Sequence, residues 1–168
     1  IQVQGNSVDL IGSFVRLIAA TRGVTDAGDL KINARKLIIQ DGAQVLTATY
    51  GKGAAGDLTV NASDFIEITG AFIDENGNPF PSALTSATFS DGNGGSVTIN
   101  TGKLLIQDGA GVSLDTSSLL ENSQFILATG KAGNLTVNAS ELVELVGKSE
   151  AGISSFLASR TINSANAG

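Results

Sequence analysis

Residues 56–70 read Gly-Asp-Leu-Thr-Val-Asn-Ala-Ser-Asp-Phe-Ile-Glu-Ile-Thr-Gly, and residues 133–147 read Gly-Asn-Leu-Thr-Val-Asn-Ala-Ser-Glu-Leu-Val-Glu-Leu-Val-Gly. Looser copies of this phrase begin at Gly28 and Gly95, so that the four starts lie 28, 39 and 38 residues apart. Repetition at this period is typical of proteins built from stacked structural repeats, because one repeat alone cannot bury its apolar face. The sequence therefore predicts a repeat architecture.

Each copy alternates apolar and polar residues after its glycine, as Leu58, Thr59 and Val60 do. Alternation at a period of two indicates a strand with one buried face. Each alternating run closes on an asparagine, and Ile1-Gln-Val-Gln4 fits as a fifth copy with glutamine in that position. We expect the equivalent inward residues to stack as one buried ladder, which comprises Val3, Ile32, Val60, Ile99 and Val137.

A second apolar run follows in each copy and ends in a glycine, at residues 12, 42, 70, 109 and 147. This position suits a turn that needs positive φ. Third strands are expected near residues 14–20, 45–49, 84–89, 125–129 and 153–159. The pattern predicts an all-β fold, a parallel β-helix or solenoid with about five coils of three short strands, and residues 1–168 form a single segment of it.

The copies alternate in type, which leaves one question of register open. Those that begin at Gly28 and Gly95 carry a Gln-Asp-Gly-Ala phrase, whereas the other two carry Glu67 or Glu144 between apolar residues. A simple alignment places Ile39 and Ile106 in the columns of these glutamates. Either the two isoleucines are exposed, or the register slips by one residue in alternate coils, which exchanges the two faces.

Two insertions interrupt the repeat. Residues 71–82 follow the second strand of one coil, and residues 110–123 are inserted at the same corner of the next coil if Gln124–Thr129 is matched to Gln44–Thr49. A competing alignment matches Gln107–Thr116 to Gln40–Thr49 and moves the second insertion beyond the third strand. Loops on a rigid scaffold often carry recognition, so we single out as candidate contact residues Phe72, Asp74, Glu75, Asn76, Phe80, Leu119 and Leu120.

Composition limits the function. The net charge of −6 argues against binding to nucleic acid, and the absence of cysteine and histidine excludes disulfides and thiol or imidazole metal sites. The sequence has no apolar run long enough to span a membrane and no recognisable signal peptide. Both ends fall inside the repeat pattern, so we expect a piece of a longer protein whose exposed end coils favour end-to-end self-association.

Several polar patterns have both a chemical and a structural interpretation. Paired carboxylates support glycoside cleavage, but the acidic residues recur with the repeat, namely Asp41, Asp108, Asp64, Glu67, Glu141 and Glu144. The asparagine column contains two glycosylation sequons, yet an amide ladder explains all of its members. Residues 74–78 and 91–95 carry oxygen ligands for calcium without a calcium-binding repeat. We therefore expect no catalysis and no cofactor, and calcium binding stays open.

The phrases Gly-Asp-Leu-Thr-Val-Asn-Ala, Lys-Leu-Ile-Ile-Gln-Asp-Gly-Ala-Gln and Val-Glu-Leu-Val-Gly together resemble the repeats of filamentous-haemagglutinin-type exoproteins, most of all large cyanobacterial members. The resemblance covers residues 28–168 and more weakly 1–27. It implies a right-handed β-helix, two-partner secretion through an outer-membrane partner, and a secreted or outer-membrane-associated surface protein acting as an adhesin or extracellular fibre. Its ligand would be a surface glycan or a protein. The alternative is a carbohydrate-binding or polysaccharide-degrading β-helix.

Overall fold

The structure, a computed structural model, describes residues 1–121 and 124–161, with side chains for all of these except residues 118–121 and 124–127. Every regular element in these ranges is a β-strand. The described residues accordingly contain no helix that is long and apolar enough to cross a membrane. The all-β part of the prediction is confirmed.

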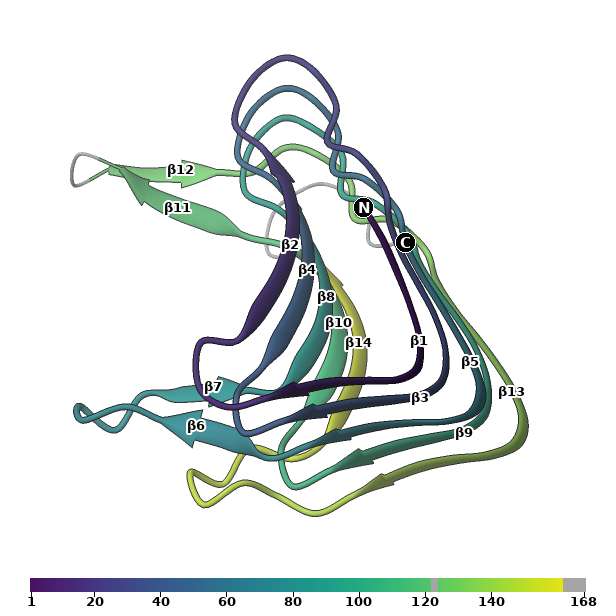
Figure 1. Ribbon diagram of the computed structural model, residues 1–168. Helices are drawn as coiled ribbons and strands as arrows, with labels where there is room; N and C mark the ends of the chain where they lie inside the picture. The colour runs from purple at the N-terminus through teal and green to yellow at the C-terminus, as the bar shows by residue number, and fades with distance from the viewer. Residues whose placement is uncertain (122–123, 162–168) are drawn as a thin grey trace.

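Two parallel sheets of five strands make up the body of the molecule (Figure 1). Successive repeats add neighbouring strands to each sheet, so the chain passes from one sheet to the other and back. The first sheet contains β1 (Gln2–Ile11), β3 (Leu30–Gln40), β5 (Leu58–Thr69), β9 (Val97–Gln107) and β13 (Leu135–Val146), in this order. The second sheet contains β2 (Arg16–Thr21), β4 (Gln44–Thr49), β8 (Ala83–Thr88), β10 (Gly111–Thr116) and β14 (Phe156–Thr161).

The expectation of three short strands per repeat is wrong, because the first two are one continuous strand. Figure 1 shows each strand of the first sheet bending sharply near its middle. Pairing continues through the bend, as in β1 and β3, where Gly5 pairs with Ala34 and Ser7 with Lys36. A repeat therefore consists of one long bent strand and one short strand.

A register shift at the bend settles where the isoleucines point. β5 carries one more residue than β3, and the shift lies between Ala62 and Phe65. Ile39 consequently pairs with Ile68, and Ile38 takes the column of Glu67. Ile39 and Ile106 are both fully buried. The second of the two alternatives, a slip of one residue in alternate repeats, is confirmed.

The core lies between the two sheets and repeats from strand to strand. The predicted ladder of Val3, Ile32, Val60, Ile99 and Val137 is in register across the first sheet. Its three central members are fully buried, and the two outer members pack against the core from the end repeats. Val45, Leu84 and Val112 of the second sheet form a facing ladder, also fully buried.

The loops that return from the second sheet to the first are stacked so tightly that side chains have no room. A Cβ added to Gly95 would overlap the carbonyl of Gly56, and one added to Gly133 would overlap the carbonyl of Gly95. The hydroxyls of Thr49 and Thr88, buried at the end of the preceding strands, donate to carbonyl oxygens within these loops. Glycine begins the copies at residues 56, 95 and 133 because adjacent backbones touch there.

The asparagine column is the amide ladder that the sequence predicts. The side-chain nitrogen of Asn61 donates to Oδ1 of Asn33, Asn100 donates to Asn61, and Asn138 donates to Asn100, each over 2.8 Å. Every described bond of the ladder runs from the later repeat to the earlier one. The asparagine side chains therefore bond to one another and need no ligand. A shift of one residue in the strand register would break these bonds.

Candidate functional site

Two antiparallel hairpins project from the second sheet on the same side of the molecule (Figure 1). β6 (Ala71–Ile73) and β7 (Pro79–Pro81) form the first, immediately before β8. β11 (Ser118–Glu121) and β12 (Gln124–Leu127) form the second, immediately after β10. Because one hairpin precedes a strand of the sheet and the other follows one, they flank the outer face of this sheet.

The placement of an insertion at residues 110–123 is wrong. Gly111–Thr116 is the strand β10, which pairs along its whole length with Ala83–Thr88. The competing alignment holds, and the inserted residues lie beyond this strand. The two insertions therefore do not share a corner, and residues 125–129 are not the short strand of their repeat. Residues 124–129 resemble the repeat strand Gln44–Thr49 because they share its first glutamine and its final Ala-Thr, but β12 pairs with β11.

The first hairpin and the loop before β2 form an aromatic cluster. Phe72 and Phe80, two of the candidate contact residues, lie with ring centroids 6.3 Å apart. Phe14 meets Phe72 at 5.3 Å and Phe80 at 5.9 Å. Phe14 is 61% exposed and has φ of 64°, a conformation that bulky residues rarely adopt. Strain of this kind is often held at functional sites.

The predicted contact residues Asp74, Glu75 and Asn76 form the tip of the first hairpin. Oδ1 of Asp74 accepts hydrogen bonds from the backbone N–H groups of Asn76 and Asn78, and its Oδ2 accepts one from the Asn78 side chain. The side-chain bond from Asn78, followed by the backbone bonds, holds the pKa of Asp74 below the usual range. Glu75 and Asn76 are exposed. The side chains of Leu119 and Leu120 lie outside the described residues.

A cavity of about 420 Å³ occupies the outer face of the second sheet, the face that the two hairpins flank. We call it the inter-hairpin groove, and its lining includes Gln44, Leu46, Thr85, Phe89, Asp115, Ser117 and Arg160. These side chains point outward because the residues between them, such as Val45 and Thr47, are buried in the core. The floor of the groove therefore consists of outward-facing side chains that the repeat places in register across the second sheet.

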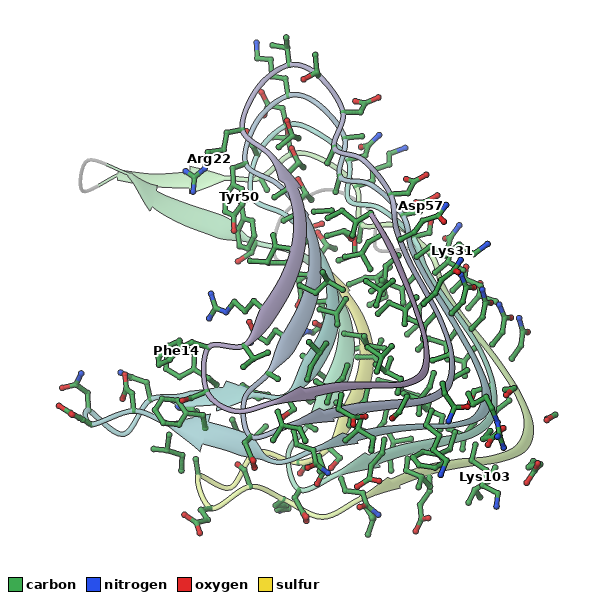
Figure 2. The ribbon with its side chains drawn as sticks, viewed as in Figure 1. Phe14, Arg22, Lys31, Tyr50, Asp57 and Lys103 are labelled. Atoms are coloured by element: carbon green, nitrogen blue, oxygen red, sulfur yellow. The ribbon has the colours of Figure 1, made fainter. Side chains whose placement is uncertain are left out.

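Aromatic and basic residues border the groove. Tyr50 stacks on Phe89 with centroids 4.9 Å apart and rings 6° from parallel, and the Arg22 guanidinium lies 4.9 Å from the Tyr50 ring centre. Figure 2 shows Arg22 and Tyr50 on the side from which the second hairpin projects, with Phe14 beside the first hairpin. The candidate contact residues predicted from the sequence include none of the groove residues, because these are scattered over four repeats.

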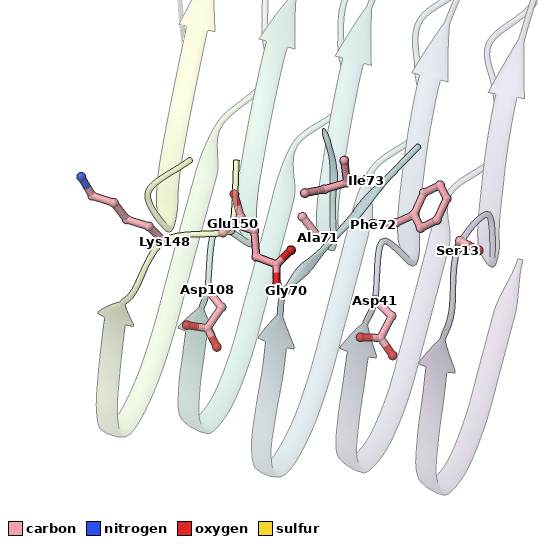
Figure 3. A pocket seen from close by; sticks show the side chains of 10 residues that line it. Ser13, Asp41, Gly70, Ala71, Phe72, Ile73, Asp108, Lys148 and Glu150 are labelled. Atoms are coloured by element: carbon pink, nitrogen blue, oxygen red, sulfur yellow. The ribbon is translucent and has the colours of Figure 1, made fainter. Parts of the chain in front are cut away.

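A second cavity, of about 660 Å³, lies along the turns that end the strands of the first sheet (Figure 3). Asp41 and Asp108 line it, two repeats apart, with Gly70 in the turn between them. Both aspartates have positive φ, 57° and 53°, and each precedes a glycine with positive φ. Turn geometry explains their recurrence, since aspartate tolerates this conformation.

The other carboxylates considered for catalysis lie on the first sheet. Asp64 pairs with Arg35 at 2.9 Å, and Glu141 pairs with Lys103 at 3.4 Å. Hydrogen bonds from Ser63 and then from Arg35 hold the pKa of Asp64 below the usual range. Glu67 accepts a bond from Gln40, and Glu144 occupies the same outward column two repeats on. Over residues 1–121 and 124–161, no three acidic side chains gather closely enough to hold a metal ion.

Comparison of the chain with known protein families, with characterised proteins and with solved structures finds no match. The geometry of the inter-hairpin groove and the repeat itself are therefore the basis for any functional interpretation.

Proposed function

We propose that this chain is a segment of a right-handed parallel β-helical exoprotein, in which a stack of five coils serves as a stiff scaffold for a contact surface. Support for the β-helix comes from the two parallel sheets, to which the chain contributes alternately. Support for the exoprotein comes from the repeat phrases, which resemble those of filamentous-haemagglutinin-type proteins. Low charge and a surface rich in Ser, Thr, Asn and Gly agree with such a setting.

The contact surface of this proposal is the inter-hairpin groove. The observation that carries it is that the two largest departures from the repeat, the β6–β7 and β11–β12 hairpins, project on one side and bracket one face. Two insertions that are merely tolerated have no reason to project on the same side of the molecule, because one precedes a strand of the second sheet and the other follows one. The scaffold then acts by holding both walls and the floor in fixed register, and the function is adhesive.

The test is to label intact cells of the producing organism with antibodies against this segment, and to measure adhesion of cells that carry a deletion of both hairpins. We expect labelling without permeabilisation, and a loss of adhesion with unchanged labelling in the deletion strain. Labelling that requires permeabilised cells would overturn the surface assignment. Unchanged adhesion in the deletion strain would overturn the contact surface.

A further inference from the structure

Arginine side chains gather on the inter-hairpin face although the chain carries a net charge of −6. Three of the four arginines of the sequence, Arg16, Arg22 and Arg160, extend from the short strands of the second sheet or the residue after one. Each is exposed and lies over an aromatic ring, at 6.0 Å from Phe14, 4.9 Å from Tyr50 and 5.9 Å from Phe156 respectively. The fourth, Arg35, is on the first sheet.

The three guanidinium groups have capacity for a ligand. Within the described residues, Arg16 and Arg22 form no ion pair or hydrogen bond through their side chains. Arg160 donates from Nε to Asp115 at 2.9 Å, which orients the group and leaves its two Nη nitrogens without a described partner. A planar guanidinium with free N–H groups matches a carboxylate or sulfate bidentately. The ring below each one restricts its position, which lowers the entropy lost on binding.

The floor of the groove excludes recognition through the main chain. β4, β8 and β10 are each paired on both sides, so their backbone N–H and C=O groups are occupied. An extended peptide gains much of its affinity by adding a strand to a free sheet edge, and the floor offers none. It offers instead the hydroxyl of Thr85, which lies 3.4 Å from that of the buried Ser113, and the outward faces of small residues. The groove must therefore recognise a ligand through side-chain hydroxyls, aromatic rings and guanidinium groups.

The spacing of the charges indicates an elongated ligand. Arg16 lies on β2 and Arg160 on β14, which are the two outermost strands of the sheet. Four strand spacings separate them, which amounts to about 19 Å at about 4.8 Å per spacing. A single small anion cannot reach both ends, whereas an extended chain that crosses the strands contacts Arg160, the floor, and Arg16 or Arg22 in turn.

We propose that the inter-hairpin groove binds a linear acidic polysaccharide, whose carboxylate or sulfate groups pair with Arg16, Arg22 and Arg160 while its sugar rings lie against the aromatic borders. This inference rests on the proposed adhesive function and specifies its ligand. The acidic residues Asp115, Asp74 and Glu75 of the same face oppose anions, and Asp115 is neutralised by its pair with Arg160.

Tyr50 provides a direct probe of the groove, because it is the one tyrosine of a chain that has no tryptophan. Titration of the 168-residue protein should change the tyrosine fluorescence with polygalacturonate or dextran sulfate and leave it unchanged with neutral dextran. These two polyanions distinguish carboxylate from sulfate recognition. Affinity measured by calorimetry should fall as salt is added, since the contacts are ionic.

The decisive comparison is between two triple variants with the same change in net charge. Arg16→Gln/Arg22→Gln/Arg160→Gln should weaken polyanion binding at least tenfold. Lys31→Gln/Arg35→Gln/Lys103→Gln, on the first sheet, should change it less than twofold. Equal losses in both variants would show unspecific attraction and overturn the proposal, as would the absence of binding to either polyanion. Urea unfolding of both variants verifies that each is folded.

Two further outcomes separate the alternatives. Polyglutamate that binds the groove as tightly as the polysaccharides would favour an acidic peptide and overturn the glycan assignment, whereas binding at least tenfold weaker supports it. A Tyr50→Ala variant should lose affinity for polysaccharide, measured by calorimetry, because the ring that positions the Arg22 guanidinium is removed. If polyanions fail to bind but surface labelling and hairpin-dependent adhesion persist, the ligand class is wrong and the adhesive function stands.

Discussion

Glycine at the start of each repeat is a packing requirement that one substitution can test. Gly95→Ala places a Cβ against the backbone of Gly56, which cannot move without disturbing the loops stacked on it. We expect this variant to lose about 2–4 kcal/mol of unfolding free energy. Gly28→Ala is the matched control, since a Cβ there has no neighbour within 4 Å. It should stay within about 1 kcal/mol of the parent. Equal urea midpoints for the two variants would contradict the stacked-loop explanation.

Adjacent residues of a strand point to opposite faces and should therefore differ in how well they tolerate substitution by a charged residue. Val60 is fully buried, so Val60→Asp places an unpaired charge in the core and should cost at least about 3 kcal/mol. Thr59 is half-buried on the outer face, and Thr59→Asp should cost less than about 1 kcal/mol. Chemical denaturation followed by circular dichroism measures both. Similar midpoints would mean that the side chains face the other way.

At the scale of the element, the first hairpin depends on one ionised carboxylate. The hydrogen bonds from Asn78 and Asn76 lower the pKa of Asp74 because they are stronger to its charged form. The ordering of the tip is therefore present above the usual pKa range of aspartate and is lost as pH falls through the lowered pKa of Asp74. Amide exchange of Asn76 and Asn78, followed by NMR, should accelerate in that pH window and at all pH values in Asp74→Ala. A pKa of Asp74 in the usual range would show that its hydrogen bonds do not order the tip of the hairpin.

The long strands of the first sheet can be predicted from the sequence, whereas the short strands of the second sheet are harder to predict. In β5, alternation, the closing asparagine and the final glycine each define a position, so the ladder from Val3 to Val137 is predictable. In β10, Gly111 and Ser113 replace larger residues because the ring of Phe156 covers Gly111 from outside. Gln124–Ala128 then matches the repeat better than the true strand does. Local pattern cannot decide between them, since only the pairing partner differs.

The bend in the first-sheet strands shows a similar limit. The sequence reveals the two halves of each strand but not that hydrogen bonding continues between them, because the residues at the bend are small and polar as in a loop. The register slip was one of two stated alternatives, and the burial of Ile39 and Ile106 decides it.

At the scale of the whole molecule, the proposed binding groove shows why a surface of this kind is hard to predict from the sequence. Its lining residues come from four different repeats, and most of them lie outside the recurring phrases. One signal was available: Arg22, Tyr50 and Phe89 each directly follow a threonine that is equivalent across the second sheet. Outward residues at that offset differ from repeat to repeat, which is expected of a recognition surface and not of a scaffold position.

Open edges at both ends predict self-association of the isolated chain. β1 and β2 are the outermost strands at one end, and β13 and β14 at the other. Leu145 lies in a core column that is fully buried at Ile106, yet it is 41% exposed in the last strand. Light scattering should show a mass that grows with concentration. Leu145→Lys should suppress this growth, whereas Thr136→Lys, on the outer face of the same strand, should not. A strict monomer at high concentration would exclude end-to-end stacking.

The β6–β7 hairpin also makes the polypeptide separable into two pieces. Its tip, residues 75–78, is exposed, while the strands on either side are paired with strands from the other piece, β5 with β9 and β4 with β8. A single cleavage after Glu75 should therefore leave fragments 1–75 and 76–168 held together under native conditions and resolved only after denaturation. The same fragments, synthesised separately, form a complementation pair. The same site should tolerate the insertion of a foreign peptide, which would be displayed at the rim of the groove.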